Sequence, residues 1–476
     1  MCSCVRSTVL IFNEWLKRSK NYVLCNETTN RKKEEATVKP VDRMKEVVVQ
    51  AKQEVQAASS MTHNDKRRSF LRKSVALAGG AGTLGLAGTQ AQAVALPVPE
   101  SNKAMGRPIP PDEYGMPSKF EAHVRRRRTD VLVNRQNFSD WSMTPLQSQL
   151  GIVTPNGLVY ERHHNGVPDI DPDSHVLAIH GMVRKPLQLT MSDLMRYPSV
   201  SKFYFMECSG NGLTDWLKPA SKTVQQTHGL LSCAQWTGVP VSWLLDEAGL
   251  LPEAKWLIAE GADGSGHLRS MPVEKMLDDC LLVYAMNGEM LRPENGYPLR
   301  LFVPGWEGNV SVKWLRRIKA GTEPWHVRGE TARYTDPMPN GMWRKFSFVM
   351  EAKSVITKPS GGMKLQPGFN EIQGFAWSGS GKIKAVDVTL DGGKNWQEAV
   401  LEDPVIDKCL TRFRFNWKWQ GGPAVIASRA VDSTGYVQPT VEDIKKSRAI
   451  VGFVQHHNGV FPWNVSATGE VTNGIG

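Results

Sequence analysis

The sequence predicts an α+β protein in which a mixed α/β domain precedes a β-sandwich. A chain of 476 residues is long for one domain. From about residue 150 to Trp343, strand-like runs alternate with a helix-like segment and Gly-rich turns. After Trp343, short runs of alternating apolar and polar residues are joined by Gly turns, a pattern typical of a sandwich. The hydrophobic content of 41% is enough to form the cores of such domains.

The N-terminal region has the features of an export signal. Residues 1–60 are polar and charged, whereas 61–93 contain Arg67 and Arg68, then an apolar run rich in Gly and a small-residue cleavage pattern. These parts indicate a twin-arginine signal; the alternative is a chance pair of arginines before an apolar helix. We therefore expect translation to start at Met61, residues 1–60 to be a non-native extension or an error in the assigned start, and the folded protein to be exported to the periplasm.

The charge balance argues against a nucleic-acid partner. The formal net charge is +11, but residues 1–93 hold 16 of the 58 Lys and Arg and 8 of the 47 Asp and Glu, which leaves +3 for the rest. The remainder therefore has no strongly basic character. No run of about 18 apolar residues occurs, so we expect no membrane span.

The four cysteines that follow the signal form no Cys-x-x-Cys pair. Cys208, Cys233, Cys280 and Cys409 therefore match neither a c-type haem attachment site nor a zinc ribbon. One or two disulfides would suit an oxidising compartment, and the sequence leaves their pairing open.

Residues 94–150 are expected to form an extended linker or wrap. Proline is frequent between residues 97 and 117. The four-arginine run 125–128 follows. We interpret it as a solvated surface, with an anionic docking patch as the alternative.

The stretch around Cys208 is the strongest candidate for a reactive site. Residues 203–206 are aromatic or apolar, as in a buried strand. Residues 209–212 then form a Gly-rich turn, where the backbone can approach a ligand closely. A thiol placed there suits a reactive group or a metal ligand; the alternative is a small apolar core cysteine.

Further motifs offer cations and backbone N–H groups to an anion. Arg162 and His164 are two residues apart on an expected strand end, so they share one face. Arg300 and Lys313 flank a Gly-rich turn, and the loop 261–266 can seat a phosphate through backbone N–H groups. These residues suit a phosphate, an oxyanion or a pterin ligand. The alternative is isolated surface charges in turns.

The remaining periodic segments complete the predicted architecture. The alternating aromatic residues in the last of them are interpreted as core. We expect strands at 174–181, 255–260 and 296–306, a helix at 241–251, and sandwich strands at 383–390 and 411–419, with a hairpin turn at Asp391-Gly392-Gly393.

Taken in order, the motifs resemble the sulfite oxidase family of molybdenum enzymes over about residues 150–445. The resemblance is carried by Tyr160-Glu161-Arg162-His163-His164, Glu207-Cys208-Ser209-Gly210-Asn211, the Asp263 loop, Asn295-Gly296-Tyr297-Pro298-Leu299-Arg300, Ser311-Val312-Lys313-Trp314, Arg333-Tyr334, and the segments 386–393 and 430–439. It implies a sulfite-oxidase-type molybdopterin domain at 151–343, an immunoglobulin-like β-sandwich dimerisation domain at 344–450 and a C-terminal tail at 451–476.

The resemblance also implies roles for single residues. Cys208 is expected to be the thiolate ligand of molybdenum in a molybdopterin cofactor, and soft thiolates suit redox metals. Arg162 and Tyr334 are expected beside the metal, where they orient a substrate anion and stabilise charge. Cofactor-binding residues are expected at Tyr160, Glu161, Arg162, His163, His164, Asp263, Asn295, Arg300, Ser311, Val312 and Lys313, with Asn295 in place of the family's usual His.

One departure favours a substrate carried by a protein. Sulfite-oxidising relatives often have an arginine shortly after the Cys-x-Gly-Asn motif, where this chain has Gly212 and Leu213. Within the family, the chain most resembles the molybdenum subunit of sulfane dehydrogenase from the bacterial sulfur-oxidation (Sox) system. This resemblance implies oxidation of sulfane sulfur, held as a persulfide on the cysteine arm of a carrier protein. It also implies a di-haem cytochrome c subunit as electron acceptor and a homodimer core, giving a heterotetramer with the cytochrome.

Two alternatives remain open. A sulfite dehydrogenase would convert free sulfite to sulfate, also with a cytochrome c acceptor. A non-catalytic β-sandwich binding protein would keep the fold without metal. No haem motif occurs in this chain, so electrons from the oxidation of sulfane sulfur or of sulfite must leave to another protein.

Overall fold

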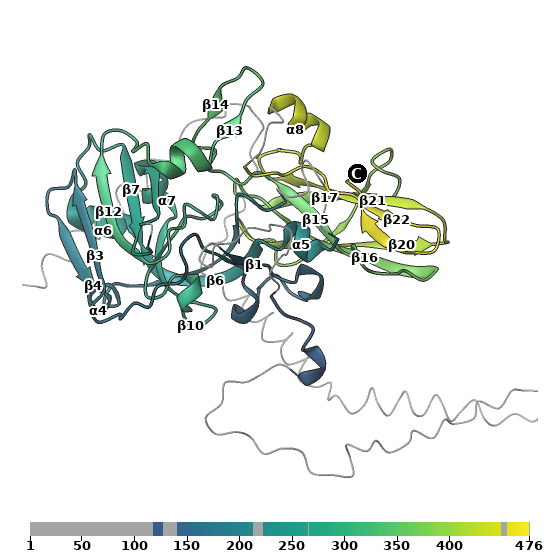
Figure 1. Cartoon of the computed structure of the whole chain (residues 1–476), viewed down its shortest axis with the longest axis horizontal. Helices are drawn as coiled ribbons and strands as arrows, with labels where there is room; N and C mark the ends of the chain where they lie inside the picture. The colour runs from purple at the N-terminus through teal and green to yellow at the C-terminus, as the bar shows by residue number, and fades with distance from the viewer. Residues whose placement is uncertain (1–117, 127–139, 213–221, 265, 449–454, 476) are drawn as a thin grey trace, which may run out of the picture. The chain divides into compact units, whose positions relative to one another are not determined.

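The computed structural model describes residues 118–126, 140–212, 222–264, 266–448 and 455–475 (Figure 1). All of them belong to the unit Asp112–Gly476. The predicted export signal, the extension 1–60 and most of the 94–150 linker lie outside the described residues.

The first domain contains two five-stranded sheets. One joins β4 (Leu187–Thr190), β3 (Val176–Gly181), β12 (Leu315–Gly321), β7 (Trp256–Gly261) and β8 (Leu268–Pro272) in that order. The other joins β10 (Glu289–Met290), β9 (Leu281–Met286), β6 (Leu231–Pro240) and β5 (Val200–Glu207), with β11 (Arg300–Phe302) also paired to β9. Strand β12 runs parallel to β3 and antiparallel to β7, so the first sheet is mixed, as the predicted α/β domain requires.

Apolar residues of the first sheet pack with two helices. Leu177 and Ile179 of β3 alternate with more exposed residues and share a core with Leu244 of α6 (Val241–Ala248) and Met276 of α7 (Val273–Asp278). The strands expected at 174–181 and 255–260 and the helix expected at 241–251 are therefore confirmed. The strand expected at 296–306 is shorter, because Pro298 and Pro304 have no N–H to donate to a ladder.

The second domain is a sandwich. Its first sheet joins β15 (Lys353–Lys358), β16 (Gly368–Trp377), β20 (Thr411–Trp419) and β19 (Val400–Glu402). Its second joins β18 (Gln397–Glu398), β17 (Ile383–Thr389), β21 (Ala424–Asp432), β22 (Trp463–Val465) and β23 (Val471–Asn473). Both sheets contribute to one apolar core that contains Phe375, Phe413, Val386 and Trp463. The predicted fold class and the predicted core role of the aromatic strand are confirmed.

The sequence placed the end of the sandwich at residue 450, but the structure extends the second sheet with β22 and β23. Trp463, Val465 and Val471 are buried in the core and alternate with more exposed residues, although each strand is only three residues long. These strands were too short for periodicity to reveal them.

Short elements lie before and between the main strands. They are β1 (Trp141–Ser142), β2 (Glu161–Arg162), α4 (Met191–Leu194), α5 (Val224–His228), β13 (Asp336–Pro337), β14 (Trp343–Arg344), α8 (Val441–Ser447), short 3-10 turns at Lys119–Glu121, Leu146–Ser148, Asn156–Leu158 and Pro293–Asn295, and a π-helical turn at Gly329–Arg333. Among the described residues, every helix is too short or too polar to cross a bilayer.

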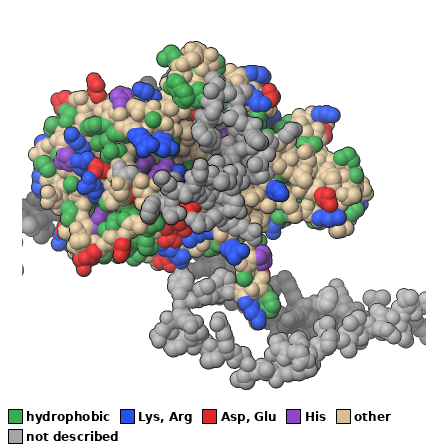
Figure 2. All heavy atoms as spheres, viewed as in Figure 1, with side chains coloured by type: hydrophobic (Ala, Val, Ile, Leu, Met, Phe, Trp, Pro, Cys, Tyr) green, Lys and Arg blue, Asp and Glu red, His purple; other side chains and the backbone are tan. Residues whose placement is uncertain are grey.

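Arg126, from the four-arginine run, is not simply solvated. It forms ion pairs with Glu161 and, at 3.5 Å from Nη2 to Oε1, with Glu294. The interpretation of the run as a solvated surface was therefore wrong for this residue. Figure 2 shows basic and acidic side chains interspersed on the visible face of the first domain, which agrees with the low net charge of the sequence after residue 93.

Candidate functional site

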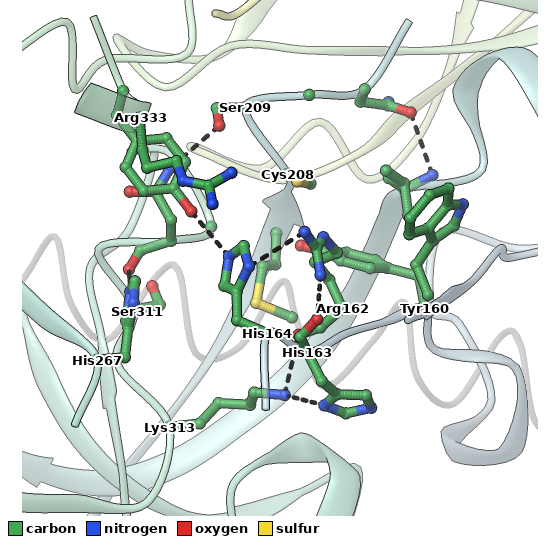
Figure 3. A pocket seen from close by; sticks show the side chains of 18 of the residues that line it. Tyr160, Arg162, His163, His164, Cys208, Ser209, His267, Ser311, Lys313 and Arg333 are labelled. Carbon is green, nitrogen blue, oxygen red and sulfur yellow. Dashed lines mark hydrogen bonds between the residues drawn. The ribbon is translucent and has the colours of Figure 1, made fainter. Parts of the chain in front are cut away.

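A cavity of about 840 Å³ lies beside the C-terminal end of β5. Its size is in the range of small-molecule sites. Segments that are far apart in the sequence meet around it (Figure 3). Most of the site residues expected from the sequence line this cavity: Tyr160, Arg162, His163, His164, Cys208, Asp263, Asn295, Arg300, Ser311, Lys313 and Tyr334.

Two expected residues do not line the cavity. Val312 is buried in the apolar core of the first domain. The Glu161 carboxylate accepts a hydrogen bond from His163 Nε2 at 2.9 Å and pairs with Arg126. The hydrogen bond from His163 is the main reason that the pKa of Glu161 lies below its usual value. Glu161 thus contacts His163 without lining the cavity, and Val312 packs in the apolar core.

The Cys208 thiol lies where β5 ends and the turn begins. The backbone N–H of Cys208 donates to Leu230 O at 3.0 Å, and the backbone carbonyl of Cys208 accepts from Asn211 N–H at 2.9 Å, which closes the turn. Burial raises the pKa of the thiol, whereas the Gly210 N–H bonded to the sulfur and the Arg162 charge lower it. The residue as a whole is half-buried. A thiol here suits a metal ligand, because a bound metal deprotonates a coordinating thiol.

Arg162, His164 and Tyr334 form a hydrogen-bonded chain. His164 Nδ1 lies 3.2 Å from Arg162 Nη2, and its Nε2 lies 3.2 Å from Tyr334 Oη. Burial, followed by the Arg162 charge, lowers the pKa of His164 to about 3, so the ring is neutral. Because a guanidinium only donates, Nδ1 accepts and Nε2 carries the proton that Tyr334 Oη accepts.

Tyr334 is therefore poised to donate its own proton elsewhere in the cavity. Its oxygen is an acceptor toward His164, which leaves the O–H free to point at another group. Burial raises the pKa of Tyr334 to about 12, so the hydroxyl stays protonated. The side chain is thus suited to stabilising negative charge on a bound group.

A second chain fixes Lys313. Its Nζ donates to His163 Nδ1 at 2.9 Å, to Glu294 O at 3.0 Å and to Arg162 O at 3.2 Å (Figure 3). Burial lowers the pKa of Lys313, and the nearby Arg300 charge lowers it further. The glycine at 296 has φ of 112° and lets this lysine come close, since a Cβ there would lie 3.2 Å from the Lys313 Cβ.

Arg300 adds a buried positive charge to the cavity wall. It donates to Ser311 O at 3.1 Å, to Asn295 O at 3.1 Å and to Met206 Sδ at 2.8 Å, all neutral acceptors. Burial lowers the pKa of Arg300 to about 10. Buried charges are normally paired, so this guanidinium suits an anionic ligand group such as a phosphate.

The lining residues fit a molybdopterin. Cys208 offers a soft ligand for the metal, and Arg300 and Lys313 offer cations to a phosphate. The Oδ1 atoms of Asn295 and Asn309 are buried without a hydrogen-bond partner in the described part of the chain. Ring N–H groups of a pterin would satisfy such acceptors. Asn295 therefore suits the position at which the family usually has His.

Sequence reasoning missed several lining residues. His267 lies 6.1 Å from the His164 ring and donates from Nε2 to Asn309 O at 2.9 Å, while its backbone N–H donates to Asp263 Oδ1. Arg328 and Arg333 also line the cavity, and both residues are exposed to solvent. The sequence motif includes Arg333 only as the neighbour of Tyr334, and no local pattern indicates that Arg328 or His267 belongs to a site.

Comparisons with known proteins agree with this geometry. Residues 164–327 match the oxidoreductase molybdopterin binding domain, and residues 344–460 match the Mo-co oxidoreductase dimerisation domain. The mitochondrial sulfite oxidase of Mus musculus is 31% identical over 335 residues, which are 64% of this chain and 61% of that protein. The sulfite oxidase of Gallus gallus is 30% identical over 334 residues, covering 64% of this chain and 72% of that protein. This chain thus matches less than two thirds of the mitochondrial relative.

A solved structure is similar over a longer part of the chain. The crystal structure of the sulfane dehydrogenase SoxCD from Paracoccus pantotrophus superposes with a TM-score of 0.77 at 44% identity. The match covers 79% of this chain and 97% of that one. With a molybdopterin-binding domain, a dimerisation domain and a thiol-bearing cavity that suits the cofactor, this chain belongs to the sulfite oxidase family of molybdenum oxidoreductases.

Proposed function

We propose that this protein oxidises sulfane sulfur held as a persulfide on the cysteine arm of a carrier protein, during thiosulfate oxidation. The likeness to the solved sulfane dehydrogenase, at 44% identity over 97% of that chain, is the observation that carries the proposal. A second observation supports it. Gly212 lines the cavity and brings no charge to the place where sulfite-oxidising relatives often have an arginine. Leu213 lies outside the described residues.

The reaction balances with water as the oxygen source. Each oxygen atom added to the terminal sulfur comes from one water molecule and releases two protons and two electrons. The bound molybdenum cofactor would supply the two-electron acceptor and the oxygen-transfer centre. The electrons then leave to a di-haem cytochrome c subunit, because this chain carries no haem motif.

The chain's own residues would divide the remaining work. Cys208 holds the metal, and Arg300 and Lys313 hold the cofactor phosphate. Arg162 orients the anionic sulfur group, because a guanidinium presents several donors to an oxyanion in a fixed geometry. The Tyr334 hydroxyl donates to the charge that develops as oxygen is added.

Assembly and compartment belong to the same proposal. The match of residues 344–460 to a dimerisation domain supports a homodimer core, which with the cytochrome subunit would form a heterotetramer. The twin-arginine pattern in 61–93 supports export in the folded state and function in the periplasm.

Steady-state kinetics with two substrates tests the proposal. The enzyme is assayed with ferricytochrome c as acceptor and either free sulfite or a persulfidated carrier protein. We expect fast turnover with the carrier and slow turnover with sulfite. A carrier whose arm cysteine is alkylated and the variant Cys208→Ser are the controls, and both should be inactive. Fast turnover of sulfite alone would instead identify a sulfite dehydrogenase, which the likeness to the sulfite oxidases favours.

A further inference from the structure

A buried carboxylate precedes the metal-binding thiol directly in the chain. Glu207 is fully buried. Its Oε1 accepts from Asn211 Nδ2 at 2.9 Å and from Lys353 Nζ at 2.9 Å, and its Oε2 accepts from Trp377 Nε1 at 2.7 Å. Asn211 belongs to the Cys208 turn, whereas Lys353 and Trp377 belong to the second domain.

Lys353 and Trp377 act as one unit of the sandwich. They face each other as a cross-strand pair of β15 and β16, and the lysine Nζ lies 5.8 Å from the tryptophan ring centroid. Lys353 Nζ also donates to the backbone carbonyl of Asn211 at 3.1 Å. The second domain therefore holds both ends of the turn, through Glu207 before the cysteine and Asn211 after it.

The first domain holds the opposite side of the same turn. Leu230 N–H donates to Asn211 Oδ1 at 3.1 Å, and Leu230 O accepts from Cys208 N–H at 3.0 Å. Within the turn, Asn211 N–H donates to Cys208 O at 2.9 Å. The direction of the sulfur thus depends on a turn that is clamped between the two domains.

Other contacts also join the two domains. Phe205 N–H donates to Lys408 O at 3.0 Å, and Lys408 Nζ pairs with Asp279 at 2.7 Å, so other contacts join the domains without reaching the turn. A buried ion pair is also a weak source of stability, because desolvation offsets much of its Coulomb energy. A role in placing the sulfur explains why a charged pair is buried beside the turn.

We propose that Lys353 and Trp377, residues of the second domain, are positioning residues for the Cys208 thiolate and thereby tune the metal that it binds. Groups that hydrogen-bond or orient a first ligand commonly change metal affinity and redox potential. The proposal rests on Cys208 being the metal ligand, and it is independent of whether the substrate is a carrier persulfide or free sulfite.

The test compares two Trp→Phe variants of the full chain. Trp377→Phe removes the donor to Glu207 and keeps a ring in the core. Trp463→Phe is the matched control, because its Nε1 donates to Ile356 O at 3.0 Å in the same domain, it is equally buried, and none of its hydrogen bonds reach the turn. Both variants lose one buried hydrogen bond, so a purely structural role predicts similar changes in both.

Three readouts report on the sulfur and its metal rather than on turnover. In cofactor-free protein, the alkylation rate of Cys208 by iodoacetamide is measured by mass spectrometry, with the buried Cys280 as internal reference. In cofactor-loaded protein, the molybdenum reduction potential and the metal retained after gel filtration are measured. We expect Trp377→Phe to change the alkylation rate, shift the potential and weaken metal retention on the order of tenfold. Trp463→Phe should match wild type in all three.

Wild-type values in Trp377→Phe, or equal shifts in Trp463→Phe, would overturn the proposal. If Trp377→Phe does not fold, Glu207→Gln takes its place, since an amide has one acceptor oxygen and cannot accept from Lys353 at one end and from Trp377 at the other. Failure of both variants to fold would show that the contacts are structural only, which also overturns it. The ratio of sulfite to carrier turnover is not expected to change, so this test and the substrate test fail separately.

Discussion

Arg269 supports the side of the cavity that carries Tyr334, and its removal makes a specific prediction. Arg269 Nε donates to Glu330 Oε1 at 2.7 Å, and its Nη2 donates to Oε2 at 3.3 Å. Both residues are almost completely buried. The guanidinium carbon also lies 4.6 Å from the Tyr334 ring centroid, and Nη1 lies 3.8 Å from the buried Glu307. Arg269 thus links β8 to the helical turn 329–333 that precedes the tyrosine.

We expect Arg269→Met to destabilise the first domain strongly. Methionine fills a similar space but leaves the Glu330 carboxylate buried without its cation, and breaking such a pair costs about 3–5 kcal/mol. At about 2–4 °C per kcal/mol for a domain of this size, the melting temperature should fall by about 6–20 °C. Turnover should fall as well, because Tyr334 loses the cation behind its ring.

Scanning calorimetry checks the prediction against a surface control. Arg196→Met breaks an exposed pair with Asp193 that solvent screens, so its melting temperature should stay near that of wild type. The double variant Arg269→Met with Glu330→Gln should recover part of the loss, because the unpaired charge is gone. A melting temperature for Arg269→Met equal to that of Arg196→Met would show that the buried pair contributes no more stability than an exposed one.

Three further predictions concern the site and the domain contact. Tyr334→Phe should lower kcat on the order of 10²-fold at unchanged molybdenum content, because the hydroxyl that donates to the developing charge, and that accepts from His164 Nε2, is lost; an unchanged kcat would remove the hydroxyl from the mechanism. The pKa of His164 is about 3 in the folded protein and 6.5 ordinarily, so below about pH 6.5 protonation of the ring favours the unfolded state. The stability of the folded state is therefore fully present above about pH 6.5, and the melting temperature should fall as the pH drops toward 3, with a smaller slope in His164→Asn. The sulfurs of Cys233 and Cys409 lie 3.2 Å apart, so oxidised glutathione in mild denaturant should oxidise the two thiols to a disulfide, with loss of two protons and two electrons. Peptide mapping should find this disulfide and should find that Cys280 is not part of it.

Local patterns predicted the parts of the site that lie within one segment. The aromatic run before Cys208 predicted β5, which ends at Glu207. Alternation in 160–164 predicted that Arg162 and His164 share a strand face; their side chains are hydrogen-bonded, but β2 ends at Arg162, so the bend after the strand brings His164 there. The prediction of β5 succeeded because strand periodicity depends only on neighbouring residues.

Contacts between distant segments could not be predicted in the same way. Glu207 and Lys353 are 146 positions apart, and no local pattern in either segment indicates that they pair. Arg269 likewise meets Tyr334 only after β8 and the turn 329–333 pack together. Such contacts depend on the packing of whole sheets, which periodicity does not encode.

Ligation of molybdenum by Cys208 can be measured directly. X-ray absorption at the molybdenum edge, combined with a pterin assay, compares wild type with Cys208→Ser. We expect the variant to keep its pterin, to lose one sulfur neighbour of the metal and to lose turnover. An unchanged sulfur shell with normal turnover in Cys208→Ser would contradict this ligation.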